Sequence, residues 1–551
     1  MRSLAFAALL AAWLTAPAVG HAGAPAADLG AALADLAGPD PARREAAVAT
    51  IGATGDPRWL AFLGALRDGG VYARPRPGRD EIVVGGTRSS EDGRDAIEIR
   101  SAYEGTPLGT VALADLVEVA ADRRLRLAIK PFLDAVETRR QLADPDAAVR
   151  RGAAVRLGNQ PSAATASAVE AALATEADPW VRHALAEALA LSRLAHGDAA
   201  ARAAAASDLG GLRSLAAVPA LERRQADAGA STAEREAAAA AVKRIERWAL
   251  LTTALETAFQ GASLASILLL MALGLAVVFG LMGVINMAHG ELMALGAYTT
   301  FVVQNWFRAA WPQAFDAYFL AALPLSFLVA ASAGVVLERG VIRRLYGRPL
   351  ETLLLTWGAS LVIQQGLRLW FGAANVDVSA PRWLSGGVPV LVGLTLPYNR
   401  VFIIGLAAVS VVAMYGLLFR SAAGLRIRAV TQNRAMSACL GVRAALVDTT
   451  TFALGAGLAG LAGCALTQIG NVGPSLGQNY IVDSFMVVVT GGVGKLAGTI
   501  LAAAGIGGLS KGIEPALGAV FAKVAILLAV ILFLQRRPAG LFAVRGRNAE
   551  A

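Results

Sequence analysis

Cysteine and histidine are scarce in this chain, and their scarcity excludes several kinds of chemistry. The sequence of 551 residues contains two cysteines, Cys439 and Cys464. Two thiols cannot supply a disulfide framework or a cysteine-based zinc site, so we interpret both as buried or unreactive. His183 and His196 each stand alone, and a metal site needs several convergent ligands. We therefore expect no metal, no cofactor and no catalytic site.

Charge is also scarce, and its distribution divides the chain. Only 17% of the residues are charged, whereas soluble proteins contain about 25%. The first part, to about residue 248, is rich in Ala, Arg, Asp and Glu, and the second part holds most of the apolar runs. A helix needs roughly 20 mostly apolar residues to cross a bilayer. The second part is therefore predicted to be an integral membrane domain.

The net charge of +9 does not point to nucleic acid. Many of the basic residues lie in short loops beside the apolar segments, where positive charge sets the orientation of membrane helices. We expect a lipid bilayer as a partner and no nucleic acid.

The first residues are typical of a secretory signal. Arg2 supplies a positive start, residues 4–14 are apolar, and small residues follow to residue 24. We predict a signal peptide at residues 1–24, with an uncleaved anchor as the alternative. Both interpretations place the following domain, residues 25–247, outside the cytoplasm.

Residues 25–247 are predicted to form a mainly helical, repeat-like domain. Alanine dominates this part, and Asp-Pro pairs recur at residues 40–41, 56–57, 144–145 and 178–179. Asp caps helix starts and Pro fits the first turn. The step of 34 residues between the last two pairs weakly resembles HEAT-type repeats. An interaction module is the simplest interpretation.

A strand-like sequence pattern interrupts this helical domain at about residues 71–116. Glu81-Ile82-Val83-Val84 and residues 96–100 alternate in the manner of strands. Gly85-Gly86 and Asp92-Gly93 are typical of turns. We expect a small β insertion among the helices.

The membrane domain is predicted to be all-α and polytopic, with about eight or nine spans or re-entrant segments. The candidate spans are residues 262–283, 287–303, 317–338, 352–371, 401–418, 446–467, 482–512 and 516–534. The glycine-broken segment 482–512 either crosses twice or dips in and returns. Broken helices at membrane depth often line a transport path.

Loop charge predicts the orientation. Loops assigned to the inside carry Arg339, Arg343, Arg344, Arg348, Arg420, Arg426, Arg428, Arg434, Arg443, Arg536, Arg537, Arg545 and Arg547. Loops assigned to the outside carry Arg308, Arg382, Arg400 and Lys511. The positive-inside rule then predicts a multi-pass protein of the bacterial inner membrane, with an exported N-terminal domain and a cytoplasmic C-terminus.

Two nucleotide-binding lookalikes lack their structural context. Residues 455–460 match G-x-G-x-x-G inside an apolar span without a preceding strand, so close helix packing explains them better. Gly494-Lys495 ends like a P-loop, but Val489 and Leu496 replace the residues that the motif requires. We expect no ATP hydrolysis by this chain.

Polar residues stand out in the segment Gly283–Leu292, at a span boundary. Asn286 is suited to cap a helix, and His289 and Glu291 are suited to the headgroup layer. The alternative is that these side chains face the bundle interior and line a solute path, because polar groups are costly against lipid. Both interpretations stay open at this stage.

The loop 424–442 is predicted to hold a short amphipathic helix with glycine near each end. A helix on the lipid surface is one interpretation. A helix that docks in the groove of a cytoplasmic partner is the other.

Together these motifs carry a family resemblance. Segments 283–292, 424–442, 484–494 and Pro538-Ala539-Gly540-Leu541-Phe542 occur in the order found in permeases of the branched-chain amino acid class of ATP-binding cassette (ABC) importers. The resemblance covers about residues 258–545. It implies an ATPase-coupling loop that includes Gly424, Arg426, Arg428, Ala429, Gln432, Asn433 and Gly441.

The resemblance also implies partners and a solute. It implies a second permease subunit, two cytoplasmic ABC ATPases and a periplasmic solute-binding protein. The exported extension looks like that of the B-type permease of urea ABC importers, which implies urea or a similar small amide. An amino acid importer is the alternative, and a passive channel or a membrane-anchored scaffold are further ones. Candidate pathway residues are Asn286, His289, Glu291, Gln365, Ser484, Thr490, Gly491 and Gly492.

Overall fold

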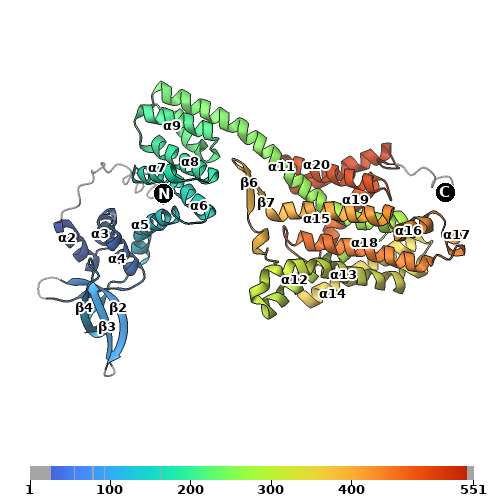
Figure 1. Cartoon of the computed structure of the whole chain (residues 1–551), viewed down its shortest axis with the longest axis horizontal. Coiled ribbons are helices and arrows are strands. Elements are labelled where there is room, and N and C mark those ends of the chain that lie inside the picture. Colours follow the sequence, from blue (N-terminus) through green and yellow to red (C-terminus); the bar gives the residue numbers. More distant parts are fainter. Residues whose placement is uncertain (1–25, 55, 77–79, 92–93, 162, 543–551) are drawn as a thin grey trace. The chain divides into compact units, whose positions relative to one another are not determined.

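The computed structural model describes residues 26–54, 56–76, 80–91, 94–161 and 163–542 (Figure 1). The predicted signal peptide lies outside these residues. The chain forms two compact units. The first unit contains the chain up to Leu212 and Ala216–Val242, and the second contains Arg213–Leu215 and the chain from Lys243 onward.

The first unit is mainly helical. Its helices are α2 (Ala26–Ala37), α3 (Pro41–Ala53), α4 (Pro57–Arg67), α5 (Arg123–Gln141), α6 (Ala147–Asn159), α7 (Ala163–Thr175), α8 (Pro179–His196), α9 (Ala199–Leu212), α10 (Val218–Ala226) and the beginning of α11 (Thr232–Met282). Helix α8 packs against α6, α7 and α9. The resemblance of this stack to HEAT repeats stays a prediction.

Most of the predicted Asp-Pro helix starts are confirmed. The carboxylates of Asp40, Asp56 and Asp178 accept hydrogen bonds from the first backbone N–H groups of α3, α4 and α8. The prediction is wrong at Asp144-Pro145, because α6 begins later and Asp146 is its N-cap. Asp144 instead accepts a hydrogen bond from the Asp146 N–H at 2.9 Å, which forms a turn before the helix.

Between α4 and α5 lies an antiparallel sheet of five strands. The strands are β1 (Val71–Arg74), β2 (Glu81–Glu91), β3 (Arg94–Ser101), β4 (Pro107–Ala112) and β5 (Val117–Glu118), in the order β4-β3-β2-β1-β5. A 3-10 turn, η1 (Leu113–Asp115), precedes β5. Val83, Ile97 and Ile99 are buried on one side of this sheet. In β3, Ile97 and Ile99 alternate with Glu98 and Arg100, which is the period of two that a half-buried strand requires.

The second unit is a helical bundle. Besides most of α11 it contains α12 (His289–Ala310), α13 (Tyr318–Gly340), α14 (Pro349–Phe371), α15 (Tyr398–Tyr415), α16 (Ala422–Gln432), α17 (Arg434–Cys439), α18 (Ala444–Leu466), α19 (Leu476–Gly491) and α20 (Leu496–Arg536). Its strands β6 (Gly387–Leu391) and β7 (Leu394–Pro397) form a hairpin. Short helical turns occur at Leu215–Ala217, Pro312–Ala317, Ile342–Leu345, Arg382–Leu384 and Gly416–Arg420.

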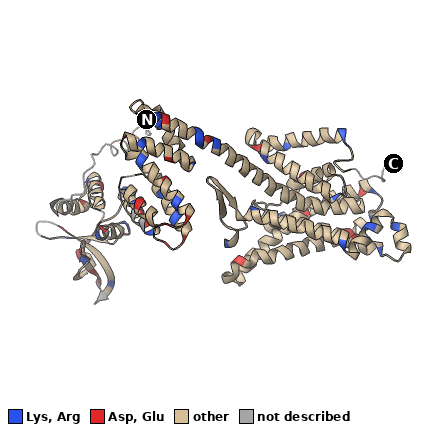
Figure 2. Ribbon diagram, turned by 45° about the horizontal axis from the view of Figure 1, so that its top comes forward, with Lys and Arg blue, Asp and Glu red and all other residues tan. Residues whose placement is uncertain are grey.

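Several of these helices are able to cross a membrane. Within the described residues, five helical segments are long and apolar enough: Thr232–Met282, Pro312–Gly340, Tyr398–Arg420, Ala444–Leu466 and Leu496–Arg536. Charged residues are sparse along the middles of the bundle helices (Figure 2). The predicted number of crossings stays a prediction.

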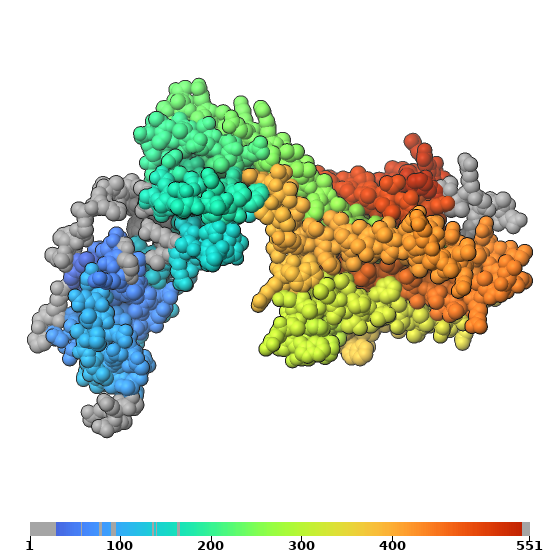
Figure 3. Space-filling view, viewed as in Figure 1, coloured from blue at the N-terminus to red at the C-terminus, as the bar shows by residue number. Residues whose placement is uncertain are grey.

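The two ends of the bundle differ in content. One end carries α16, α17 and the last described residues, and the other carries the β6–β7 hairpin (Figure 1). The described arginines assigned to inner loops lie in segments at the first of these ends, and Arg545 and Arg547 lie outside the described residues. In Figure 3 the orange surface of α15 to α17 makes up much of the visible face of this unit.

The glycine-broken segment is a tight turn between two helices. Helix α19 ends at Gly491 and α20 begins at Leu496. Leu541 N–H donates to the Thr490 carbonyl at 2.8 Å, so the chain returns to this turn after α20. Helix α20 is interrupted at Gly518, where φ is +78°. The first half of α20 therefore runs away from the α19–α20 turn, and the second half returns toward it. Three helical segments thus follow residue 475: α19 and the two halves of α20.

Candidate functional site

A break in the helices lies beside α11, about three turns before the end of that helix. Helix α11 ends at Met282, and residues 283–288 are non-helical before α12 begins at His289. The His289 Nε2 atom lies 3.1 Å from the carbonyl oxygen of Met271, which is 11 residues before the end of α11. Because α11 rises about 1.5 Å per residue, α12 begins well inside the bundle. It does not begin at the bundle's end.

A second break meets the first. After α18 ends at Leu466, the chain is non-helical until α19 begins at Leu476. A Cβ atom added to Gly477 would lie 2.5 Å from the backbone carbon of Gly290. The N-terminal turns of α12 and α19 are therefore in backbone contact, and neither position has space for a side chain.

Glycines also allow close contact elsewhere in the bundle. Gly274 of α11 faces Gly455 of α18, where an added Cβ would lie 2.4 Å from the Gly455 carbonyl oxygen. Gly460 of α18 packs against Ser326 of α13 in the same way. The G-x-G-x-x-G sequence at 455–460 therefore serves helix packing, as its apolar context predicted.

Buried polar atoms without partners gather around the first break. Asn286, His289 and Glu291 are each at most 1% exposed. The Asn286 Oδ1 atom accepts from the Ala288 N–H at 3.0 Å, and Glu291 Oε1 accepts from the Ser360 hydroxyl at 3.3 Å. Asn286 Nδ2, His289 Nδ1 and Glu291 Oε2 have no hydrogen-bond partner within the described residues. Such atoms are costly to bury without a partner, so they make the first break a candidate binding site.

Helix α14 supplies further buried polar side chains beside the first break. Thr356, Ser360 and Gln364 recur every four residues and are all buried, so they share one helix face. The Thr356 hydroxyl accepts from the Met287 N–H at 3.1 Å. The amide of Gln364 accepts from Gln478 of α19 at 3.4 Å, and its own Nε2 has no partner in the described part of the chain. We call Asn286, His289, Glu291, Thr356, Ser360, Gln364 and Gln478 the central cluster.

The other residues that the sequence predicted for the solute pathway are not part of the central cluster. Gln365 is on the exposed side of α14, and its neighbour Gln364 takes the buried position. Ser484 is buried and donates to the Tyr480 carbonyl of its own helix. Thr490, Gly491 and Gly492 lie at the α19–α20 turn, against residues 539–542. Thr356, Ser360, Gln364 and Gln478 were not predicted as pathway residues from the sequence.

A polar cavity of about 360 Å³ lies near the β6–β7 hairpin. Its lining includes Asp377, Asn399, Arg400, Thr467 and Gln468. Gln468 is 6% exposed, and its Oε1 has no partner among the described residues. The cavity is formed in part by the second break, so it gives water access to the non-helical chain there.

The predicted coupling loop forms two short helices at the opposite end. The Ser421 hydroxyl caps α16 through the Gly424 N–H, and Asn433 caps α17 through the Met436 N–H at 2.9 Å. Gly441 ends the hairpin with φ of +83°, a backbone shape that favours glycine. Arg426, Arg428 and Gln432 are exposed and Ala429 is half-buried. Leu425, Met436 and Leu440 are exposed apolar residues on the same hairpin.

Ionic contacts anchor this hairpin to the bundle. Arg434 forms an ion pair with Asp448 of α18 at 2.6 Å, and its guanidinium lies 4.9 Å from the ring centroid of Tyr346. The Tyr346 hydroxyl donates to Glu338, which is fully buried and is paired with Arg343. Burial and the nearby carboxylates raise the pKa of Tyr346. These contacts join α17 to α18 directly and to α13 through Tyr346.

A metal site has no support in the described ranges. No group of three or more His, Cys, Asp or Glu residues there is arranged to hold a metal ion. The central cluster contains one carboxylate, one imidazole, amides and hydroxyls, and this set is suited to hydrogen bonding of a small polar molecule.

Known proteins resemble the second unit. The chain is 29% identical over 301 residues to the high-affinity branched-chain amino acid transport system permease protein BraD of Pseudomonas aeruginosa, covering 52% of this chain and 95% of that protein. It is 28% identical over 301 residues to LivH of Escherichia coli K12, a permease protein of the same kind of system, covering 52% and 94%. It is 28% identical over 278 residues to the ribose import permease protein RbsC of the same strain, covering 48% and 81%.

A family model also matches the second unit. The match covers residues 257–535, and the family is described as the permease component of branched-chain amino acid transport systems. The residues of the first unit lie outside this match. The central cluster, both helix breaks and the α16–α17 hairpin all lie within it, and the chain belongs to this family of transport permeases.

Proposed function

We propose that this chain moves a small polar solute across the inner membrane through the central cluster, as the permease subunit of an ATP-driven importer. The observation that carries the proposal is the meeting of two broken helices beside buried polar atoms without partners. In transporters, such half-helix ends bind solute near the middle of the membrane.

The solute path is proposed to lie between this chain and a second permease subunit. Gln478 is exposed and bonds to the buried Gln364, so the cluster reaches the surface of the unit there. Gln365 is exposed on the adjacent face of α14. A second permease that covers this surface would enclose these side chains in a polar path.

The α16–α17 hairpin is proposed to receive the ATPase. Its exposed Leu425, Met436 and Leu440, flanked by Arg426 and Arg428, provide an apolar contact with a basic rim. The anchored pair Arg434–Asp448 would convert ATPase motion into motion of α18. Two cytoplasmic ATPases and a periplasmic solute-binding protein complete the proposed assembly, with the hairpin and C-terminus inside.

The proposed solute is urea or a similar small amide. The amides and hydroxyls of the cluster match its donors and acceptors, and the cluster contains no lysine or arginine that would pair with a carboxylate. A branched-chain or other amino acid is the second candidate. The relatives' transport of branched-chain amino acids and the free Oε2 of Glu291, a suitable acceptor for an ammonium group, both favour it.

One experiment separates the two solutes. The assembled complex is reconstituted, and ATP hydrolysis is compared with urea and with leucine, each with its own binding protein. Stimulation by urea alone supports the amide, and stimulation by leucine alone supports the amino acid. Solute flux that needs no ATP and survives removal of 424–442 would contradict the importer and indicate a channel.

The first unit is proposed to be exported and to assist assembly or capture of the binding protein. Its exposed charged helix faces suit a protein contact. Removal of this unit is expected to weaken complex formation or uptake, and unchanged values of both would contradict the proposal.

A further inference from the structure

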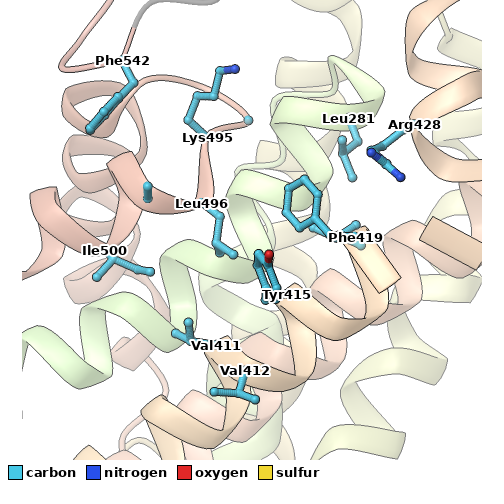
Figure 4. Close-up of a pocket in the computed structure, with 13 residues that line it drawn as sticks. Leu281, Val411, Val412, Tyr415, Phe419, Arg428, Lys495, Leu496, Ile500 and Phe542 are labelled. Carbon is cyan, nitrogen blue, oxygen red and sulfur yellow. The ribbon is translucent and has the colours of Figure 1, made fainter. Parts of the chain in front are cut away.

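An apolar crevice near the α16–α17 end of the bundle lies outside the central cluster. It has a volume of about 640 Å³, and α11, α15, α16 and the α19–α20 turn line it. Val411, Val412, Tyr415, Leu496 and Ile500 form part of its apolar wall (Figure 4). Val412 is 70% exposed, so this wall is not closed by the chain itself.

Two cations line the same crevice. Lys495 follows the α19–α20 turn, and Arg428 projects from α16; both are exposed. In Figure 4 both lie toward one end of the crevice, and the apolar side chains Val411, Val412 and Ile500 lie toward the other. Arg428 stacks on the Phe419 ring at 5.4 Å from its centroid, and among the described residues neither cation forms an ion pair with a carboxylate.

We propose that this crevice binds one anionic phospholipid, with its phosphate between Lys495 and Arg428 and an acyl chain along Val411, Val412 and Ile500. The separation of charge and apolar wall matches the amphiphilic shape of a lipid. Basic pockets between membrane helices on the cytoplasmic side are suited to anionic headgroups. An apolar protein helix without acidic residues would cover the wall equally well but would leave the two cations without a partner.

Because the crevice borders the α16–α17 hairpin, a bound lipid would also affect coupling to the ATPase. Arg428 belongs to the proposed coupling hairpin, and Lys495 belongs to the turn that joins α19 to α20. A phosphate that binds both would hold the hairpin against the bundle. Anionic lipid is therefore expected to affect coupling as well as to be retained.

Lipid retention tests the site independently of transport. The full chain is purified in detergent, and binding of phosphatidylglycerol and phosphatidylethanolamine is measured by native mass spectrometry. We expect phosphatidylglycerol to bind at least about fivefold more tightly, because one basic residue near an anionic headgroup contributes on the order of 1 kcal/mol. Equal binding of the two lipids would overturn the proposal.

Two variants and a control locate the binding. Lys495→Gln is expected to weaken phosphatidylglycerol binding about fivefold. Arg344→Gln removes the same charge from an exposed position outside the crevice and should leave binding unchanged. Equal losses in these two variants would show diffuse attraction and overturn the site.

A third variant tests the apolar wall. Ile500→Trp fills the crevice without changing charge and should reduce binding of phosphatidylglycerol. If Ile500→Trp instead releases a copurifying protein chain and leaves lipid binding unchanged, the crevice is a protein interface and the proposal is wrong.

Discussion

The two units of this chain differ at one buried carboxylate, although Glu338 and Asp448 of the second unit are paired with arginine in the same way as the carboxylates of the first. In the first unit, Arg150 pairs with Glu176 at 2.8 Å and Arg202 pairs with Glu234 at 3.1 Å, so buried carboxylates are neutralised. In the second unit, the buried Glu291 has one oxygen without a partner among the described residues. The contrast separates polar groups that hold a fold together from polar groups that are kept available.

The two units also differ in how much of their large apolar side chains is exposed. The second unit exposes large apolar side chains, among them Trp370 at 87% and Leu350 at 82% exposure. The largest apolar exposures in the described first unit are lower, at 61% for Val117 and 60% for Leu127. Apolar surface on this scale needs lipid or protein contact. The second unit therefore combines an apolar exterior with a polar centre.

The largest expected effect comes from the available carboxylate. Glu291→Gln keeps the size of the side chain and an acceptor for Ser360 but replaces the free Oε2 acceptor with an amide donor. We expect uptake by the reconstituted complex to fall about tenfold or more, since sites built around a buried hydrogen-bonding group are sensitive to its loss.

The matched control is Glu351→Gln, which alters an exposed carboxylate paired with Arg348 on the same helix, α14, as Ser360. Uptake by this control should equal that of the wild type. Normal uptake by Glu291→Gln would show that the central cluster only supports the fold.

The second-largest effect is expected from a charge placed on the exposed apolar surface of the α16–α17 hairpin. Leu440 is 78% exposed, so Leu440→Asp should leave the fold intact while weakening ATPase binding about tenfold. Copurification of the ATPase and ATP-driven uptake measure this. Val388→Asp changes an exposed residue of β6 at the other end and should retain both activities. Equal behaviour of the two variants would remove the hairpin from coupling.

A smaller effect is expected for a neutralised pair of the first unit. The bond to Arg150 lowers the pKa of Glu176 from 4.5 to about 2. The folded unit therefore binds fewer protons than the unfolded chain, so this contribution to stability is present above pH 4.5 and is lost as the pH falls toward 2. Glu176→Gln should lower the melting temperature on the order of 5 °C at pH 7.

The difference between wild type and Glu176→Gln should shrink as the pH is lowered. Thermal unfolding of the full chain at several pH values, followed by hydrogen exchange of α6 to α8, measures it. A difference that is independent of pH from 7 down to 2 would show that the charge of Glu176 contributes nothing.

The smallest effect is the loss of one helix cap. Asp178→Ala removes the acceptor for the first N–H groups of α8 and should destabilise the first unit by about 1 kcal/mol. Hydrogen exchange should increase in α8 and remain unchanged in α18. Asp144→Ala, at the Asp-Pro pair that does not cap a helix, should cost less, and a larger cost there would contradict the assignment of caps.

Sequence periodicity predicted the helices of the membrane unit better than their interruptions. Apolar runs locate helices because burial in lipid is an average over many residues. The apolar pattern did not show that α12 begins beside α11 about three turns before the end of that helix. This position depends on the contact between Gly290 and Gly477, which are far apart in the chain. The break in α20 was expected near residues 512–516 and occurs at Gly518.

The same limit explains the difference between Gln364 and Gln365. Neighbouring residues point about 100° apart on a helix, so the choice of glutamine depends on which face of α14 is buried. The recurrence of Thr352, Thr356, Ser360 and Gln364 at four-residue steps held that information. At Asp144-Pro145, by contrast, local sequence did not distinguish a helix cap from the turn that precedes one.

The glycine contacts restrict how this permease opens and closes. Where Gly274 meets Gly455 and Gly290 meets Gly477, main chain rests on main chain, and no side chain is present to change rotamer and make room. Sliding one helix past another would drive a neighbouring Cβ into these points. For the proposed importer we therefore expect alternating access to come from tilting about these contacts, with the two non-helical links bending on either side of them.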